Sequence, residues 1–197
     1  IDFERLRQEF ASSPKKNTTV CALNDAIDKR LKKMLERNPL RIDYYEKYLK
    51  IIAEYNSEKD RVTIEKTFEQ LMRFISELDQ EERRAIQEGL DEEHLALFDL
   101  LVKPTLSKQA IARVKKVACE LLDRLKAEKL KIDHWKEKDA TRSEVKTFIH
   151  NFLWDENTGL PVEEYNPEEV ERKAAVVFEH IYRIYEDAEH HIYRNVA

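Results

Sequence analysis

Hydrophobic residues recur along almost the whole chain at the three- and four-residue spacing of amphipathic helices. The clearest stripe consists of Ile64, Phe68, Leu71, Met72, Ile75 and Leu78. Nine segments carry such a stripe: 3–10, 19–36, 43–55, 64–78, 80–88, 91–102, 107–125, 145–154 and 166–185. Neither an alternating β-branched run nor an internal repeat is present. The pattern predicts an all-α fold, an irregular bundle of about nine helices.

The expected helix ends follow from local residue chemistry. Asn38 precedes Pro39 and is pushed out of the helical region, so a helix should stop there. Gly89 should separate two short helices. Ser107 is expected to cap the long helix that follows Pro104, which makes the segment EEHLALFDLLVKPTLSK a helix–turn–helix corner built for packing. Two regions are therefore predicted, 1–102 and 103–197, or one continuous domain.

Asn166, followed by Pro167 and Glu168, should begin the last helix, because it combines a cap, a first-turn proline and an acid that favours the helix dipole. The chain has 197 residues, of which 38% are charged, and no run approaches the roughly 20 apolar residues that span a bilayer. It has no signal peptide and begins with Ile1, so we expect a piece of a longer cytoplasmic protein. Cys21 and Cys119 are expected to be buried, reduced thiols.

The glycine content excludes several kinds of chemistry. Phosphate-binding loops need two or three glycines within a few residues, whereas Gly89 and Gly159 are the only glycines of the chain and lie far apart. Glu-x-Lys triplets at 144–146 and 171–173 lie in helical patterns, so they do not indicate a nuclease. No serine or cysteine has the surroundings of a nucleophile. We therefore expect no catalytic residue and no cofactor in this chain.

Six histidines raise the question of a metal site. Asp91 with His94 and Asp187 with His190 form Asp-x-x-His pairs, but the Glu-x-x-His motif of di-iron bundles does not occur. Isolated acid–histidine pairs are typical of solvated helix faces. The sequence predicts no metal ligand, and a helical metal enzyme is the disfavoured alternative.

Charge is segregated into blocks. Residues 103–146 hold 13 Lys or Arg against 7 Asp or Glu, a net charge of +6, although the whole chain carries −5. Lys108, Lys115 and Lys126 should share one line of the long helix beside its core face. A solvated face is one interpretation, and weak, sequence-independent binding of double-stranded DNA is the other. The candidate DNA contacts are Lys108, Arg113, Lys115, Lys116, Lys126, Lys129 and Lys131.

Four tyrosines are grouped on one predicted helix: Tyr44, Tyr45, Tyr48 and Tyr55. They could stack on bases, but at helical spacing some must face the core, and a packed helix or a protein interface explains them without nucleic acid. They are therefore our candidates for a protein interface.

The order of several segments resembles the C-terminal helical region of type I restriction enzyme R (restriction and motor) subunits. The resemblance extends from about Asp2 to Tyr185. Its segments are FERLRQEF, NPLRIDYYEKYLKIIAEYN, KDRVTIEKTFEQLMRF, EEHLALFDLLVKPTLSKQAIARVKKVACELLDRLK and RSEVKTFIHNFLWDENTGLPVEEY, with a closing VVFEHIY. Each is unspecific alone, and their order carries the resemblance.

The resemblance implies a parent subunit with an N-terminal nuclease and two helicase-type motor domains, which uses ATP and Mg to draw in DNA. No nuclease or motor motif of such a parent matches a position of this chain. The implied role is non-catalytic: docking the parent onto the methyltransferase and specificity subunits, with 1–102 packing toward the motor domains, and contacting DNA. The alternative is a stand-alone helical adaptor unrelated to DNA.

Overall fold

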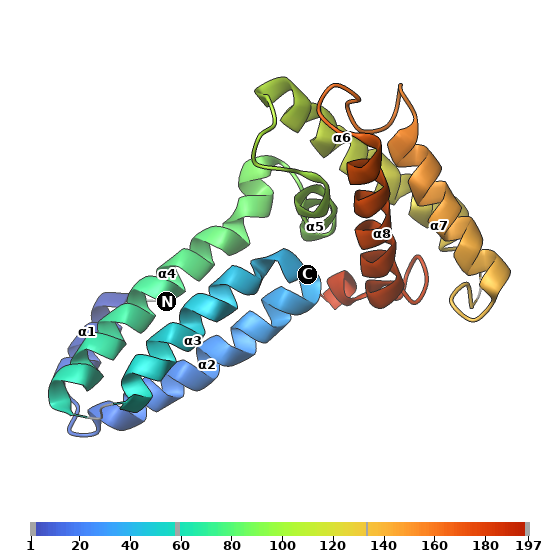
Figure 1. Ribbon diagram of the computed structural model, residues 1–197. Coiled ribbons are helices and arrows are strands. Elements are labelled where there is room, and N and C mark those ends of the chain that lie inside the picture. The colour runs from blue at the N-terminus through green and yellow to red at the C-terminus, as the bar shows by residue number, and fades with distance from the viewer. Residues whose placement is uncertain (1–2, 58–59, 133, 196–197) are drawn as a thin grey trace. The chain divides into compact units, whose positions relative to one another are not determined.

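The computed structural model describes residues 3–57, 60–132 and 134–195, and the chain divides into two compact units, 1–87 and 88–197 (Figure 1). Within the described residues there are eight α-helices, two short 3-10 helices and one π-helical turn, and no strand is formed. A single isolated bridge there joins Tyr185 and His191. The predicted all-α class is confirmed.

The first unit contains four helices: α1 (Phe3–Ser12), α2 (Lys16–Arg37), α3 (Ile42–Ser57) and α4 (Arg61–Glu88). Their apolar stripes meet in one core, which includes Phe10, Val20, Ile27, Leu31, Tyr48, Tyr55, Phe68, Leu71, Phe74 and Leu78. The rings of Phe10 and Phe68 stack with centroids 3.7 Å apart, which fastens α1 to α4. The stripes predicted from periodicity are therefore the faces that pack.

Helix α4 joins two segments that the sequence pattern predicts as separate helices, 64–78 and 80–88. Asp79 and Gln80 continue it without a break, because neither glycine nor proline occurs between Arg61 and Glu88. Gly89 itself has φ of +68°, a left-handed conformation that ends the helix as predicted. This continuity accounts for eight α-helices instead of about nine.

The second unit contains α5 (Glu92–Leu101), α6 (Lys108–Arg124), α7 (Asp139–Trp154) and α8 (Pro167–Ile184). Helix α5 is buried on nearly all sides, and it packs against α6 and α8, while α7 and α8 lie side by side (Figure 1). A π-helical turn, Leu125–Lys129, extends α6. Beyond it, Trp135 is fully buried with its ring edge-on to Tyr182.

Three predicted helix ends are confirmed in detail. Ser107 accepts a hydrogen bond from the Ala110 N–H at 3.2 Å, and Asn166 forms a reciprocal capping box with Glu169. Asn38 ends α2, and its side chain then accepts from the Leu40 N–H of a 3-10 turn at 3.1 Å. These caps satisfy N–H groups that a helix start leaves without an intrahelical partner.

The division between the units lies ahead of the boundary expected after residue 102. Helix α5 belongs to the second unit, because Leu95, Leu97 and Leu101 are buried where α5 packs on α6 and α8. Glycine at position 89 therefore marks the change of unit better than Pro104 does. Among the described residues, no helix combines the length and the apolar character needed to cross a membrane.

The two cysteines are free thiols, but the prediction that both are buried is wrong. Cys21 lies on the exposed side of α2 and Cys119 is half-buried on α6. An apolar-periodic segment does not bury a residue at its edge, and Cys21 follows the core residue Val20 by one position, about 100° around the helix.

Candidate functional site

Two lysines of the predicted line, Lys115 and Lys126, face carboxylates of neighbouring helices. Lys115 Nζ lies 2.7 Å from Glu88 Oε2 and donates to the Glu88 carbonyl at 3.0 Å. Lys126, one further step along the same line, pairs with Glu93 of α5, whose side chain is buried. Lys115 lies on α6 and Lys126 in the π-helical turn that extends it, and both face carboxylates on this side. That side is occupied by carboxylates, which compete with any phosphate for the same charges.

Of the remaining candidate DNA-contact residues, some form contacts within the chain and others have no carboxylate partner among the described residues. Arg113 donates to the carbonyls of Glu156 at 2.6 Å and Gly159 at 3.2 Å, so it holds a loop. Lys116 and Lys129 lie 3.5 and 3.7 Å from Glu120 and Glu144. Within the described part of the chain, Lys108 and Lys131 have no carboxylate partner. DNA binding stays a prediction, and it rests on fewer available charges than the sequence indicates.

The four candidate interface tyrosines belong largely to the core of the first unit. Tyr48 and Tyr55 are 4% and 6% exposed, and the Tyr48 hydroxyl donates to Asn24 Oδ1 at 2.6 Å. Tyr44 and Tyr45 are half-buried against the same core. Burial raises the pKa of Tyr48 to about 12 and that of Tyr55 to about 12. An interface role therefore rests on the exposed parts of Tyr44 and Tyr45.

Both Asp-x-x-His pairs form local hydrogen bonds with the backbone, at the start of α5 and in the turn after α8. Asp91 Oδ1 accepts from the His94 N–H at 2.8 Å and lies 2.8 Å from His94 Nδ1, which caps α5 and raises the pKa of His94. Asp187 accepts from the His190 N–H at 2.7 Å, and such backbone bonds lower its pKa to about 2. Among the described residues, no three potential ligands lie close enough together to hold a metal ion.

Two buried polar groups of the second unit escaped the sequence analysis. His180 is 3% exposed on α8, and burial lowers its pKa to about 4. Its position between Val177 and Ile181 on the apolar stripe is the signal that could have found it. Glu93 of α5 is 7% exposed and lies 2.8 Å from His191 Nδ1 as well as next to Lys126. A lone acid within a strongly apolar helix is the corresponding signal.

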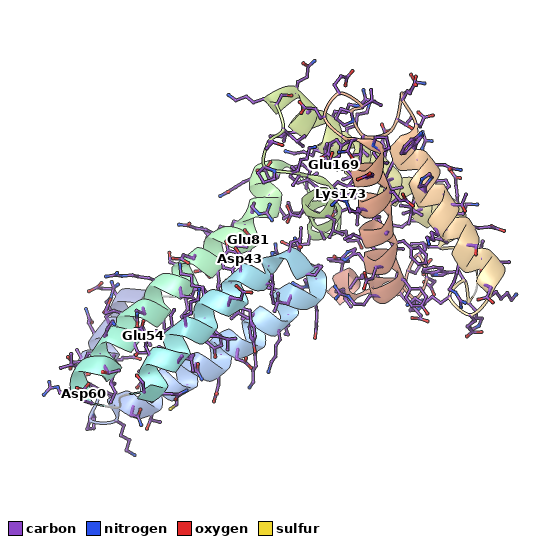
Figure 2. All side chains as sticks on the ribbon, viewed as in Figure 1. Asp43, Glu54, Asp60, Glu81, Glu169 and Lys173 are labelled. Carbon is purple, nitrogen blue, oxygen red and sulfur yellow. The ribbon has the colours of Figure 1, made fainter. Side chains whose placement is uncertain are left out.

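The helix–turn–helix corner at 92–108 is held by α8. Lys173 donates to the carbonyls of Leu100 at 2.6 Å and Val102 at 3.1 Å, and the Tyr165 hydroxyl donates to the Leu101 carbonyl at 2.8 Å. These donors satisfy the free carbonyls at the end of α5. Figure 2 labels Lys173 on α8 beside Glu169. The corner is a packing device, as the sequence predicts.

The loop between α7 and α8, residues 155–166, is the most tightly constructed irregular segment of the second unit. Asp155 Oδ1 accepts from the N–H groups of Asn157 and Thr158 at 2.9 and 2.8 Å. A Cβ on Gly159 would lie 2.4 Å from the Leu153 carbonyl oxygen, so only glycine fits there. Arg113 holds the same turn from α6.

This loop and the adjoining helix ends form a hollow of about 310 Å³. It is lined chiefly by apolar side chains: Leu153, Trp154, Leu160, Val162, Pro167 and Val170. Trp154 is 47% exposed and Val162 is 61% exposed. The sequence analysis did not single out this groove, because it treats residues 155–165 only as a connection.

Comparison with known protein families identifies the chain's relatives. The family described as type I restriction enzyme HindI endonuclease subunit-like, C-terminal, matches residues 2–187. The chain belongs to this family. The resemblance found from the order of its segments is thereby confirmed, and the chain is a C-terminal domain of the type I restriction endonuclease subunit-like family. Searches of curated proteins and of solved structures gave no match.

Membership in the restriction endonuclease subunit-like C-terminal family bears on how the contacts described above are interpreted. The stand-alone adaptor unrelated to DNA is disfavoured, because the family is one of restriction enzyme subunits. The charged side chains of this restriction-subunit domain mostly hold helices, caps and loops together. Its apolar groove is the feature that these internal contacts leave open to solvent.

Proposed function

We propose that this chain is the non-catalytic docking domain of an ATP-dependent, DNA-translocating restriction subunit. It would hold the nuclease and motor parts of that subunit on a core of methyltransferase and specificity subunits. The family match over residues 2–187 is the observation that carries the proposal. ATP and Mg would then act in other domains of the same subunit, in the cytoplasm, with residues 1–102 packing toward the motor domains.

The geometry of the domain supports this assignment. Its ion pairs and caps hold helices and loops, and its apolar groove is suited to a protein partner better than to a small polar substrate. Interaction surfaces commonly combine exposed aromatic side chains with a polar rim, and Trp154 is such a side chain.

Removal of residues 1–197 from the subunit that carries them tests the docking role. We expect ATP hydrolysis by the truncated subunit to persist, while stable association with the methyltransferase core is lost in size-exclusion chromatography. The chain alone should hydrolyse no ATP above a blank. A truncated subunit that assembles normally would contradict the proposal.

Weak contact with duplex DNA is a second candidate function, favoured by Lys108 and Lys131, which lack carboxylate partners among the described residues. Two phosphate contacts imply a log–log salt dependence of about −2, since each contributes about −0.9. Reversing both charges, Lys108→Glu and Lys131→Glu, should weaken binding alike for all DNA sequences. Lys146→Glu on α7 is the matched control. Equal binding by the double variant and the parent would remove this candidate.

A further inference from the structure

The groove between α7 and α8 is an apolar surface that the chain does not cover. Trp154 and Val162 are among the most exposed large apolar residues of the second unit, and both line the same hollow of about 310 Å³. This volume is at the lower end of the roughly 300–1,000 Å³ found for binding pockets. It is large enough to receive one or two large side chains.

The loop that lines the groove is held by contacts within the chain. Gly159 packs directly on the end of α7, where its N–H donates to the Asp155 carbonyl at 2.7 Å. Arg113 fixes the loop from α6, and the Leu160 N–H donates to the Leu153 carbonyl at 3.0 Å. The Trp154 ring stacks on His150, with centroids 5.7 Å apart and planes 12° apart. A preformed surface loses little conformational freedom on binding, which favours affinity.

The rim of the groove is acidic and is not neutralised by the chain. Residues 155–169 contain six Asp or Glu and no Lys or Arg. Two of the six are used locally, because Asp155 caps its turn and Glu169 lies 2.9 Å from Lys103 Nζ. The other four have no cation partner among the described residues: Glu156, Glu163, Glu164 and Glu168. Glu156 itself lines the groove, and Glu163 and Glu164 line a neighbouring hollow that shares the loop.

We infer that this groove binds a segment of another subunit of the restriction complex, in which a bulky apolar side chain is flanked by lysine or arginine. The apolar side chain would fill the hollow against Trp154 and Val162, and the flanking cations would approach the four unpaired carboxylates. Buried aromatic anchors dominate binding energy at interfaces, while rim charges govern the rate of association and its salt dependence.

The same charges argue against nucleic acid at this surface. A phosphate backbone approaching Glu156, Glu163 and Glu164 would meet three charges of its own sign. Arg113, the cation beside them, is engaged by the Glu156 and Gly159 carbonyls. The inference rests on the proposed docking role for the identity of the partner. The chemistry of the partner segment follows from the groove alone.

Three synthetic peptides test that chemistry on the full chain by fluorescence anisotropy. The first alternates leucine with lysine, the second replaces its leucines by serine, and the third replaces its lysines by glutamate. We expect the first to bind at least about tenfold more tightly than either other peptide. Trp154→Ala or Val162→Ser should weaken its binding by roughly tenfold or more, the loss typical of an interface anchor.

Matched variants distinguish binding in the groove from nonspecific binding elsewhere on the chain. Val176→Ser removes an exposed apolar side chain of α8 outside the groove and should leave binding unchanged. Glu163→Gln with Glu164→Gln should weaken binding a few-fold at low salt and not at high salt, whereas Glu171→Gln should have no effect. Equal binding of the serine peptide, or unchanged binding by Trp154→Ala and Val162→Ser, would overturn the inference.

The assembled complex supplies the partner. A photo-crosslinking amino acid at position 162, in a subunit bound to the methyltransferase core, should attach to a Lys- or Arg-rich segment of another subunit, and one at position 176 should not. Normal assembly with no crosslink at 162, or with a crosslink to DNA, would refute the groove while the docking role stands. Failure to assemble at all, with intact peptide binding, would instead refute the docking role.

Discussion

Both units of the chain form ion pairs between their elements, and the second unit adds an acidic loop beside an apolar groove. In the first unit, exposed acids and bases pair across helices: Arg30 with Asp79 and Glu82, Lys47 with Glu77, and Lys66 with Glu54. In the second unit, the α7–α8 loop leaves four carboxylates without a cation partner among the described residues, beside an apolar groove. Carboxylates without a cation partner occur in both units, but only in the second do they adjoin an apolar groove with an exposed tryptophan among the described residues. The proposed docking is therefore best tested at the groove of the second unit.

The units also differ in how they can be observed. Both tryptophans and all six histidines lie in residues 88–197. Tryptophan fluorescence therefore reports the second unit alone, while far-ultraviolet circular dichroism reports the helices of both. Unfolding of such a chain need not be two-state, so the two signals should be followed together.

The largest expected effect concerns the buried ion pair of the first unit. Arg41 Nε lies 2.9 Å from Glu81 Oε1, and the two side chains are 3% and 7% exposed. Arg41→Ala would leave the Glu81 carboxylate buried with less compensation, which costs roughly 3–5 kcal/mol, toward the lower end because Arg84 Nε also lies 3.0 Å from Glu81.

Lys47→Ala is the matched control, because it breaks an exposed pair with Glu77 that is worth about 1 kcal/mol or less. Urea denaturation followed by circular dichroism should show the loss for Arg41→Ala, with tryptophan fluorescence little changed. Equal losses of stability in the two variants would mean that the buried ion pair contributes no more to the stability of the first unit than the exposed one.

The second-largest expected effect is a pH dependence of the stability of the second unit. Burial lowers the pKa of His180 to about 4, against about 6.5 for an unfolded histidine. Between these values the unfolded chain binds a proton that the folded chain does not, so stability falls as the pH falls from 6.5 to 4. A difference of about 2.5 pKa units corresponds to about 3 kcal/mol.

His94 acts in the opposite sense, because its hydrogen bond with Asp91 raises its pKa. Its contribution is fully present below the unfolded pKa and is lost as the pH rises through the folded one. His180→Phe isolates the buried group: the fluorescence-detected stability of the second unit should then depend less on pH between 4 and 6.5. An unchanged pH profile in this variant would show that His180 is protonated in the folded state.

The sequence predicted the helices well and the groove not at all, and the reason is physical. Period and capping are local, so Ser107, Asn166 and Gly89 could be assigned from their neighbours alone. Segments 64–78 and 80–88 form one helix because no glycine or proline separates them. Hydrophobic periodicity alone does not take this into account. Spacing also predicts that Lys115 and Lys126 share one side of the long helix. That this side meets Glu88 and Glu93 is a tertiary fact that spacing cannot supply.

The smallest expected effect compares the two glycines, which mark different constraints. Gly89 has φ of +68° with nothing within 4 Å of an added Cβ, so Gly89→Ala meets only backbone strain of roughly 1–2 kcal/mol. Gly159 has the opposite problem, since its Cβ would lie 2.4 Å from a backbone oxygen that cannot move without shifting the end of α7.

Gly159→Ala should therefore destabilise the second unit by an amount typical of overpacking, roughly 1–3 kcal/mol, and it should also displace the loop that carries Val162. We expect iodide quenching of Trp154 to change in Gly159→Ala and to stay as in the parent in Gly89→Ala, measured in a Trp135→Phe background so that one tryptophan reports. If both alanine variants leave the quenching unchanged while losing similar stability, the groove does not depend on the close packing at position 159. Backbone strain at position 89 and close packing at position 159 would then have the same effect on the groove, namely none.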